Sequence, residues 1–111
     1  MEDREVQIAT TESLFRDVNE RIAETSERFD ANEAEFLCEC ADPACAERLE
    51  VPLDEYEEVR GDGTTFLVNP EHVEPEVERI ERHRRGYAIV RKFDGIVAGI
   101  VRRLDPRSAA F

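Results

Sequence analysis

The chain has 111 residues, of which 27 are acidic and 15 are basic, so its formal net charge at pH 7 is -12. This length is typical of a single domain with a moderate hydrophobic core. The negative charge favours solubility and disfavours direct binding to nucleic acid, whose phosphates call for a basic surface. The densest basic run, Arg82–Arg85, is short and is surrounded by glutamates.

The sequence predicts a cytoplasmic protein that does not enter a membrane. No segment approaches the roughly 20 consecutive apolar residues of a membrane span, and Met1–Arg4 lacks the apolar core of a signal peptide. In a reducing compartment, clustered cysteines are more often metal ligands or redox groups than structural disulfides. The chain has 3 cysteines, and an odd number cannot all pair within it.

Residues 1–34 are predicted to form an N-terminal unit built on an amphipathic helix. Apolar residues and threonines recur at alternating spacings of three and four, which places them on one helical face. This stripe consists of Ile8, Thr11, Phe15, Val18, Ile22, Thr25 and Phe29. Leu14 widens it, while Arg16 and Asn19 are expected on the solvent side. The helix begins at a capping threonine, Thr10 or Thr11, or further back, near Glu5.

The heptad-like spacing of the stripe is compatible with a homodimer through the N-terminal helix. Fewer than four repeats are present, however, and two of the positions are threonine, which adds little apolar burial. The alternatives are that the stripe packs on its own domain or docks in the groove of another protein. The pattern alone leaves these three arrangements open.

Residues 35–104 are predicted to form a small α+β body, and residues 105–111 a flexible tail. Period-two and β-rich segments indicate strands at residues 36–40, 49–51, 64–68, 87–93 and 96–101, with a short helix at residues 53–60. The last two strands are expected to form a hairpin through Asp94–Gly95. Residues 77–82 fit either a helix or a hairpin arm that ends at Gly86. The predicted fold class is therefore α+β.

Cys38, Cys40 and Cys45 form a C-x-C-x4-C motif that we interpret as part of a structural zinc site. Thiolates suit Zn²⁺, and side chains two apart on a strand project to one side. A structural site needs four ligands, and the chain has only two histidines, His72 and His83. We favour His72, which lies in a turn fixed by a proline, because arginines surround His83. His83 or a water molecule is the alternative fourth ligand.

Two other interpretations of the cysteines stay open. In the first interpretation, the three cysteines are reduced and serve as small hydrophobic residues of the core. In the second, the C-x-C pair exchanges disulfides with Cys45, as in a redox sensor or oxidoreductase. A catalytic zinc would need a base, for which Glu39, Glu47 or Glu71 is available. The signatures of catalytic zinc sites and of phosphate-binding loops are absent from the sequence, so we expect no enzyme activity.

Five segments carry a resemblance to a known group of proteins: residues 12–22, 36–45, 55–60, 69–72 and 75–79. In these segments the chain resembles small uncharacterised actinobacterial proteins, and the similarity extends over nearly the whole chain. The resemblance implies that the helix and the Cys/His body belong to one unit. It also implies that Cys38, Cys40, Cys45 and His72 form a shared metal site. It implies no activity.

The function predicted from these features is that of a zinc-stabilised protein-interaction module with a regulatory role. The amphipathic helix or the acidic surface would contact a protein partner, and the zinc would organise the body. A thiol-based redox protein is the alternative. A third hypothesis, an acidic mimic of nucleic acid, is motivated only by the net charge.

Overall fold

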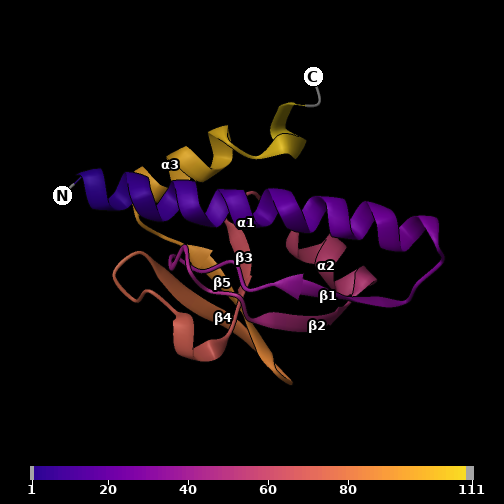
Figure 1. Ribbon diagram of the computed structural model, residues 1–111. Helices are drawn as coiled ribbons and strands as arrows, with labels where there is room; N and C mark the ends of the chain where they lie inside the picture. Colours follow the sequence, from indigo (N-terminus) through magenta and orange to yellow (C-terminus); the bar gives the residue numbers. More distant parts are fainter. Residues whose placement is uncertain (1, 110–111) are drawn as a thin grey trace.

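The computed structural model describes residues 2–109. A long helix, α1 (Glu2–Arg28), runs across the molecule, with the strands on one side of it and the C-terminal helical segments on the other (Figure 1). The remaining elements are β1 (Glu33–Leu37), β2 (Arg48–Pro52), α2 (Leu53–Val59), β3 (Thr65–Val68), η1 (Pro70–His72), β4 (Glu78–Arg84), β5 (Tyr87–Lys92), α3 (Gly95–Arg103) and η2 (Pro106–Ala109). The predicted α+β class is confirmed.

The strands form two antiparallel sheets. In the first, β1 pairs with β2, and in the second the strand order is β3-β5-β4. The pairing of Phe36 with Leu49 places both side chains in the core, where the Phe36 ring stacks on Tyr56 of α2 with centroids 4.3 Å apart. The predicted returning strand and the predicted short helix are thus confirmed.

The β4–β5 hairpin turns at Gly86, whose φ of 87° is readily adopted only by glycine. This settles the ambiguity of residues 77–82 in favour of the hairpin arm. The predicted hairpin through Asp94–Gly95 is wrong, because α3 follows instead. The Asp94 side chain caps this helix by accepting hydrogen bonds from the backbone N–H groups of Ile96 and Val97, at 2.9 and 3.1 Å.

Helix α1 begins at Glu2, earlier than either predicted start, and its buried face is not the predicted one. Arg16 and Asn19, which were expected in solvent, are buried, whereas Leu14 and Phe29 are 63% and 77% exposed. The physical reason is that the body presents open backbone groups to the helix. Arg16 donates to the carbonyl oxygens of Gly63 and Val101, both at 2.7 Å. Polar side chains are therefore needed on the inner face.

Asn19 fills a similar need at the open edge of β1. Its amide donates to the Leu37 carbonyl at 3.0 Å, and its carbonyl accepts from the Leu37 N–H at 2.8 Å. The side chain thus takes the place of a neighbouring strand. Because both backbone groups are satisfied in this way, the edge can be covered by a helix without an unpaired donor or acceptor.

A buried ionic cluster joins α1 to the larger sheet. The Lys92 ammonium lies between the carboxylates of Glu12 and Glu78, and all three side chains are fully buried. Burial is the main reason that the pKa of Glu12 is raised from 4.5 to about 8, and the nearby Glu78 raises it further while Lys92 opposes the shift. Glu12, whose pKa is raised to about 8, therefore holds a proton near neutral pH.

Residues 105–109, the described part of the predicted tail, contact the body. Asp105 is buried and forms an ion pair with Arg60, and Arg107 binds Glu20 of α1 at 2.6 Å. Burial alone would raise the pKa of Glu20, but hydrogen bonds from Arg107 and Tyr56 lower it to about 2. None of the helices within residues 2–109 has both the length and the apolar character of a membrane span.

Candidate metal centre

The side chains of Cys38, Cys40, Cys45 and His72 lie together, and one potential ligand atom of each is within 4.8 Å of all the others. Four ligands at about 2.3 Å from a tetrahedral zinc ion would be about 3.8 Å apart, so the cluster needs only a small contraction to hold a metal. The structure thus brings together the four residues predicted from the sequence. His83 lies on the exposed strand β4, outside this cluster.

The C-x-C pair follows directly after β1, and the backbone there still forms hydrogen bonds with neighbouring segments of the chain. The Cys38 N–H donates to the Glu47 carbonyl at 3.0 Å, and the Glu39 N–H donates to the Leu67 carbonyl at 2.8 Å. Alternation along this segment sends the two cysteine side chains to one side and the Glu39 side chain to the other. This is the arrangement expected from the C-x-C spacing.

Glu39 anchors the cysteine segment to the interior. Its carboxylate accepts hydrogen bonds from the Asn19 amide at 2.8 Å and from the Leu67 N–H at 2.9 Å, and burial raises its pKa. The side chain is fully buried between α1 and β3. Helix α1 is therefore connected to the Cys3His cluster through one residue, Glu39, that lies between two of the candidate ligands.

Cys45 returns to the pair through the turn that the Asp42–Pro43 dipeptide predicts. The Asp42 side chain accepts a hydrogen bond from the Ala44 N–H at 2.9 Å, and its backbone carbonyl accepts one from the Cys45 N–H at 3.0 Å. Cys45 is partly exposed, whereas Cys38 and Cys40 are buried. One side of the cluster therefore faces solvent.

His72 ends η1, the short helix that Asn69 caps through a hydrogen bond from the Glu71 N–H at 2.8 Å. The Nδ1 atom of His72 lies 3.5 Å from the Cys38 sulfur and 3.7 Å from the Cys45 sulfur. The Nε2 atom lies 3.1 Å from a carboxylate oxygen of Glu47. The ring therefore directs Nδ1 to the thiols and Nε2 to an acid.

Two residues that surround the cluster were not predicted in this role. Asn69 donates from its side chain to Glu47 at 2.7 Å and from its backbone to the Cys38 sulfur at 3.2 Å. Glu47 was considered only as the base of a catalytic zinc. A carboxylate that accepts from the second ring nitrogen of a histidine is a frequent support of metal ligands. The sequence gives no signal for this contact, because Glu47 and His72 are far apart along the chain.

The three thiols do not ionise alike. A hydrogen bond between Cys38 and Cys40 raises the pKa of Cys38 and lowers that of Cys40 to about 5, and burial raises the pKa of Cys45. Without a cation, one thiolate in the cluster is favoured over three. A bound metal ion supplies the positive charge that allows all three sulfurs to be thiolates.

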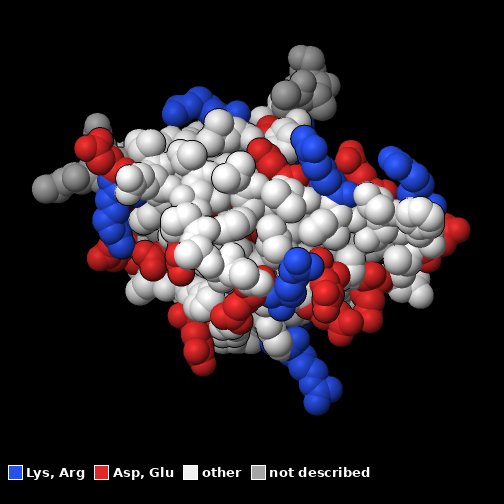
Figure 2. Space-filling model, viewed as in Figure 1, with Lys and Arg blue, Asp and Glu red and all other residues white. Residues whose placement is uncertain are grey.

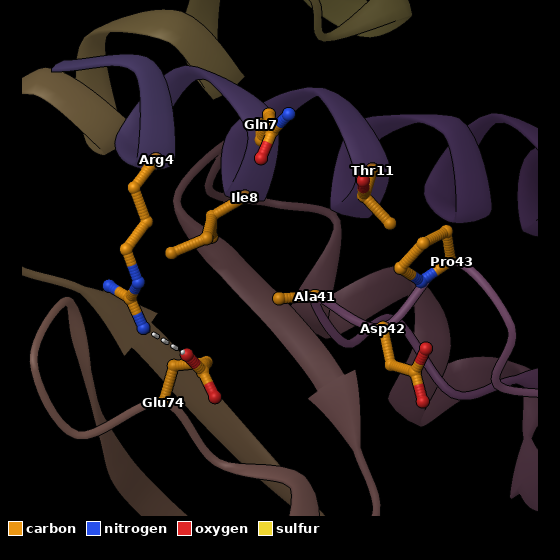
Figure 3. A pocket seen from close by; sticks show the side chains of 8 residues that line it. All are labelled: Arg4, Gln7, Ile8, Thr11, Ala41, Asp42, Pro43 and Glu74. Carbon is orange, nitrogen blue, oxygen red and sulfur yellow. Dashed lines mark hydrogen bonds and ion pairs between the residues drawn. The ribbon is translucent and has the colours of Figure 1, made fainter. Parts of the chain in front are cut away.

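A hollow of about 460 Å³ lies beside the cluster, between the first turns of α1 and the loop that carries Asp42 (Figure 3). Ile8 and Thr11 line it from the helix, and an ion pair between Arg4 and Glu74 closes one end at 3.0 Å. None of the four candidate ligands is among the described residues that line this hollow.

A comparison with known protein families, with curated proteins and with solved structures finds no match to this chain. The resemblance to small actinobacterial proteins thus stays a prediction. The function has to be argued from the cluster and from the surfaces around it.

Proposed function

We propose that the chain is a zinc-stabilised protein-interaction module in which Cys38, Cys40, Cys45 and His72 hold a structural Zn²⁺ ion. The orientation of His72 carries this proposal, because Nδ1 faces the sulfurs while Nε2 binds Glu47. Three soft sulfur ligands and one imidazole suit zinc better than calcium or magnesium, which prefer oxygen. The three thiols are free, as metal ligands must be.

A structural role for the metal follows from the number of protein ligands. Four side chains complete a tetrahedral site, whereas a catalytic zinc keeps one position open for water. Two of the four ligands are buried, and the cluster joins the end of β1, the following loop and η1. The metal would therefore contribute to folding in a reducing compartment such as the cytoplasm.

The interaction role rests on the surface that the fold leaves uncovered. Leu14 and Val18 on α1, and Phe29 directly after it, are all at least 40% exposed, although much of the inner face of the same helix is polar. Large exposed apolar residues along one helix are typical of a binding surface. A regulatory protein that presents this helix to a protein partner accounts for both features without catalysis.

The test is metal content combined with thermal stability. Protein purified under reducing conditions without added metal should contain about one zinc ion per chain by elemental analysis. A strong chelator should lower the melting temperature by more than about 10 °C, because zinc binding contributes several kcal/mol to folding. His72→Ala should lose the metal on dialysis against a weak chelator. The matched control His83→Ala, on exposed β4, should keep it. A zinc-free protein with chelator-insensitive melting would refute the proposal.

The low pKa of Cys40, about 5, favours one second candidate, a thiol-based redox function. Oxidation would join two sulfur atoms, release two protons and pass two electrons to a peroxide, which is reduced to water. This candidate requires metal-free protein that forms a disulfide reversibly under mild oxidation. Peptide mapping by mass spectrometry that finds all three thiols unchanged would exclude it.

A further inference from the structure

The outer face of α1 carries an apolar stripe, defined as Leu14, Phe15, Val18 and Ile22 together with Thr11, Thr25 and Phe29. Phe29 is the first residue after α1 and continues its last turn, because its N–H donates to the Thr25 carbonyl at 3.3 Å. Leu14, Val18 and Phe29 are 63%, 40% and 77% exposed, and Phe15 and Ile22 are half-buried. Figure 2 shows a broad area free of charged side chains across the middle of the same face, where α1 runs in Figure 1. No other described element covers the exposed members of the stripe.

The surface of the stripe has the shape that a second helix requires. A hollow of about 320 Å³ lies among Val18, Arg21, Ile22 and Thr25, with Ser26 at its border. These four residues are spaced i, i+3, i+4 and i+7, which is the spacing of the hole that receives one side chain of a facing helix. A facing helix can therefore insert a side chain at this point.

We propose that the occupant is α1 of a second copy of this chain, packed antiparallel to the first. In the antiparallel register that pairs Val18 with Ile22 of the second copy, Phe15 lies opposite Thr25 and Phe29 lies opposite Thr11. Each aromatic residue thus meets a small one. A parallel pair would instead place Phe against Phe and Thr against Thr, which crowds some layers and leaves others underfilled. The two threonines, which look unfavourable in a seam, become complementary to the aromatics.

This inference rests on the proposed function, because it names a second copy of the chain as the partner of the interaction module. The stripe from Thr11 to Phe29 is about 28 Å long and about 10 Å wide, so it offers on the order of 300 Å² per chain. A stable interface needs roughly 800 Å² per chain. The dimer is therefore weak and reversible, with a dissociation constant in the micromolar range or above.

The net charge distinguishes a second copy from another protein. Each chain carries a formal charge of -12, so two copies repel each other at low salt, and screening should tighten the dimer. A partner with a basic surface would show the opposite dependence, because salt would screen an attraction. The sign of the salt effect thus identifies the occupant.

The experiment is sedimentation equilibrium of the zinc-loaded full chain at about 1 to 200 µM, in about 0.05 and 0.5 M salt. The average mass should rise above 12.8 kDa toward twice that value with concentration, and more steeply at the higher salt. Leu14→Glu should weaken the dimer on the order of tenfold or more. Leu104→Glu is the matched control, because Leu104 is 45% exposed at the end of α3, outside the stripe, and it should leave the mass curve unchanged.

Orientation is tested with a photoreactive benzoylphenylalanine in place of Phe29. Cross-links should join it to a peptide that contains Thr11 of the second copy. Cross-links from position 29 of one copy to a peptide that contains position 29 of the other copy would overturn the antiparallel arrangement. A constant monomer mass, equal effects of Leu14→Glu and Leu104→Glu, or weaker association at higher salt would each overturn the dimer. Because the zinc content is measured on the same sample, any of these results would leave the metal site standing.

Discussion

Replacing Glu12 with glutamine should make the protein more stable above neutral pH. Glu12 and Glu78 face the single cation of Lys92, and all three side chains are fully buried. The carboxyl oxygens of Glu12 have no hydrogen-bond partner beyond this ion pair. A glutamine has the shape of the protonated acid and cannot ionise. The variant therefore keeps the cluster in the charge state that burial favours.

The sign and size of the effect follow from the two pKa values of Glu12. The group titrates near 4.5 when exposed and at about 8 in the folded protein. Between these pH values the folded state holds more protons than the unfolded state, so stability falls as the pH rises. At about 1.4 kcal/mol per pH unit, the rise from pH 4.5 to pH 8 lowers the free energy of unfolding by on the order of 5 kcal/mol. The loss is complete above pH 8 and absent below pH 4.5.

The assay is urea unfolding followed by circular dichroism between about pH 5.5 and pH 9. At the acid end Glu12→Gln should be more stable than the wild type by only about 1 kcal/mol, because pH 5.5 lies one unit above the unfolded pKa of 4.5, and the difference should grow to several kcal/mol at the alkaline end. The difference between the two proteins cancels the pH dependence of metal binding, which they share. Glu24→Gln, at an exposed position of α1, is the control and should follow the wild type. Parallel curves for Glu12→Gln and the wild type would refute the reasoning.

Three further predictions concern contacts of the metal centre and the helices. Glu47→Ala should weaken zinc binding about 10- to 100-fold in competition with a chromophoric chelator, because Glu47 orients His72, whereas Glu71→Ala should have little effect. Asn19→Ala should lower the free energy of unfolding by about 1–3 kcal/mol in urea titrations, since it leaves the Leu37 backbone groups and one carboxylate oxygen of Glu39 without their Asn19 partner. Asp94→Ala should cost about 1 kcal/mol in the same assay, through loss of the α3 cap. An unchanged midpoint in either unfolding experiment would contradict the corresponding contact.

The sequence is most informative where the structure depends on local chemistry. The three cysteines lie within eight residues, and the proline turn that precedes His72 is also local. Spacing and ligand chemistry were therefore enough to predict that these four residues lie together. The contact between Glu47 and His72 could not be predicted from the sequence, because it depends on how distant segments of the chain pair. No pattern in the sequence marks one glutamate among many as the partner of a histidine.

Helix α3 was missed for a different physical reason. Its β-branched residues, among them Ile96 and Val97, favour a strand by propensity, and Asp94–Gly95 is a common hairpin turn. In the structure Val97 and Val101 are buried at the four-residue spacing of a helix, and Asp94 serves as a cap. Tertiary packing against α1 and the local cap together override a propensity of a few tenths of a kcal/mol per residue.

The inner face of α1 was assigned to solvent because hydrophobic periodicity treats every charged residue as exposed. That rule fails where the surface beneath a helix offers hydrogen-bond partners. A glutamate, an arginine and an asparagine on three successive turns, Glu12, Arg16 and Asn19, each find a buried partner on the body. Only the spatial arrangement of β1, β5 and α3 shows that these partners exist.

The polar inner face also explains how the outer stripe acquires a defined position. If α1 slid by one turn, Asn19 would leave Leu37 and Arg16 would leave Val101, and each buried group without a partner would cost about 1–3 kcal/mol. An apolar inner face would tolerate such a slide far better, since van der Waals contacts are not directional. Glu39 binds Asn19 from its place between Cys38 and Cys40, so the register of the helix is set against the metal-binding segment itself. The candidate metal centre and the apolar stripe are therefore parts of one arrangement, in which the segment of Cys38 and Cys40 fixes where α1 lies and α1 presents the surface that we propose for a second chain.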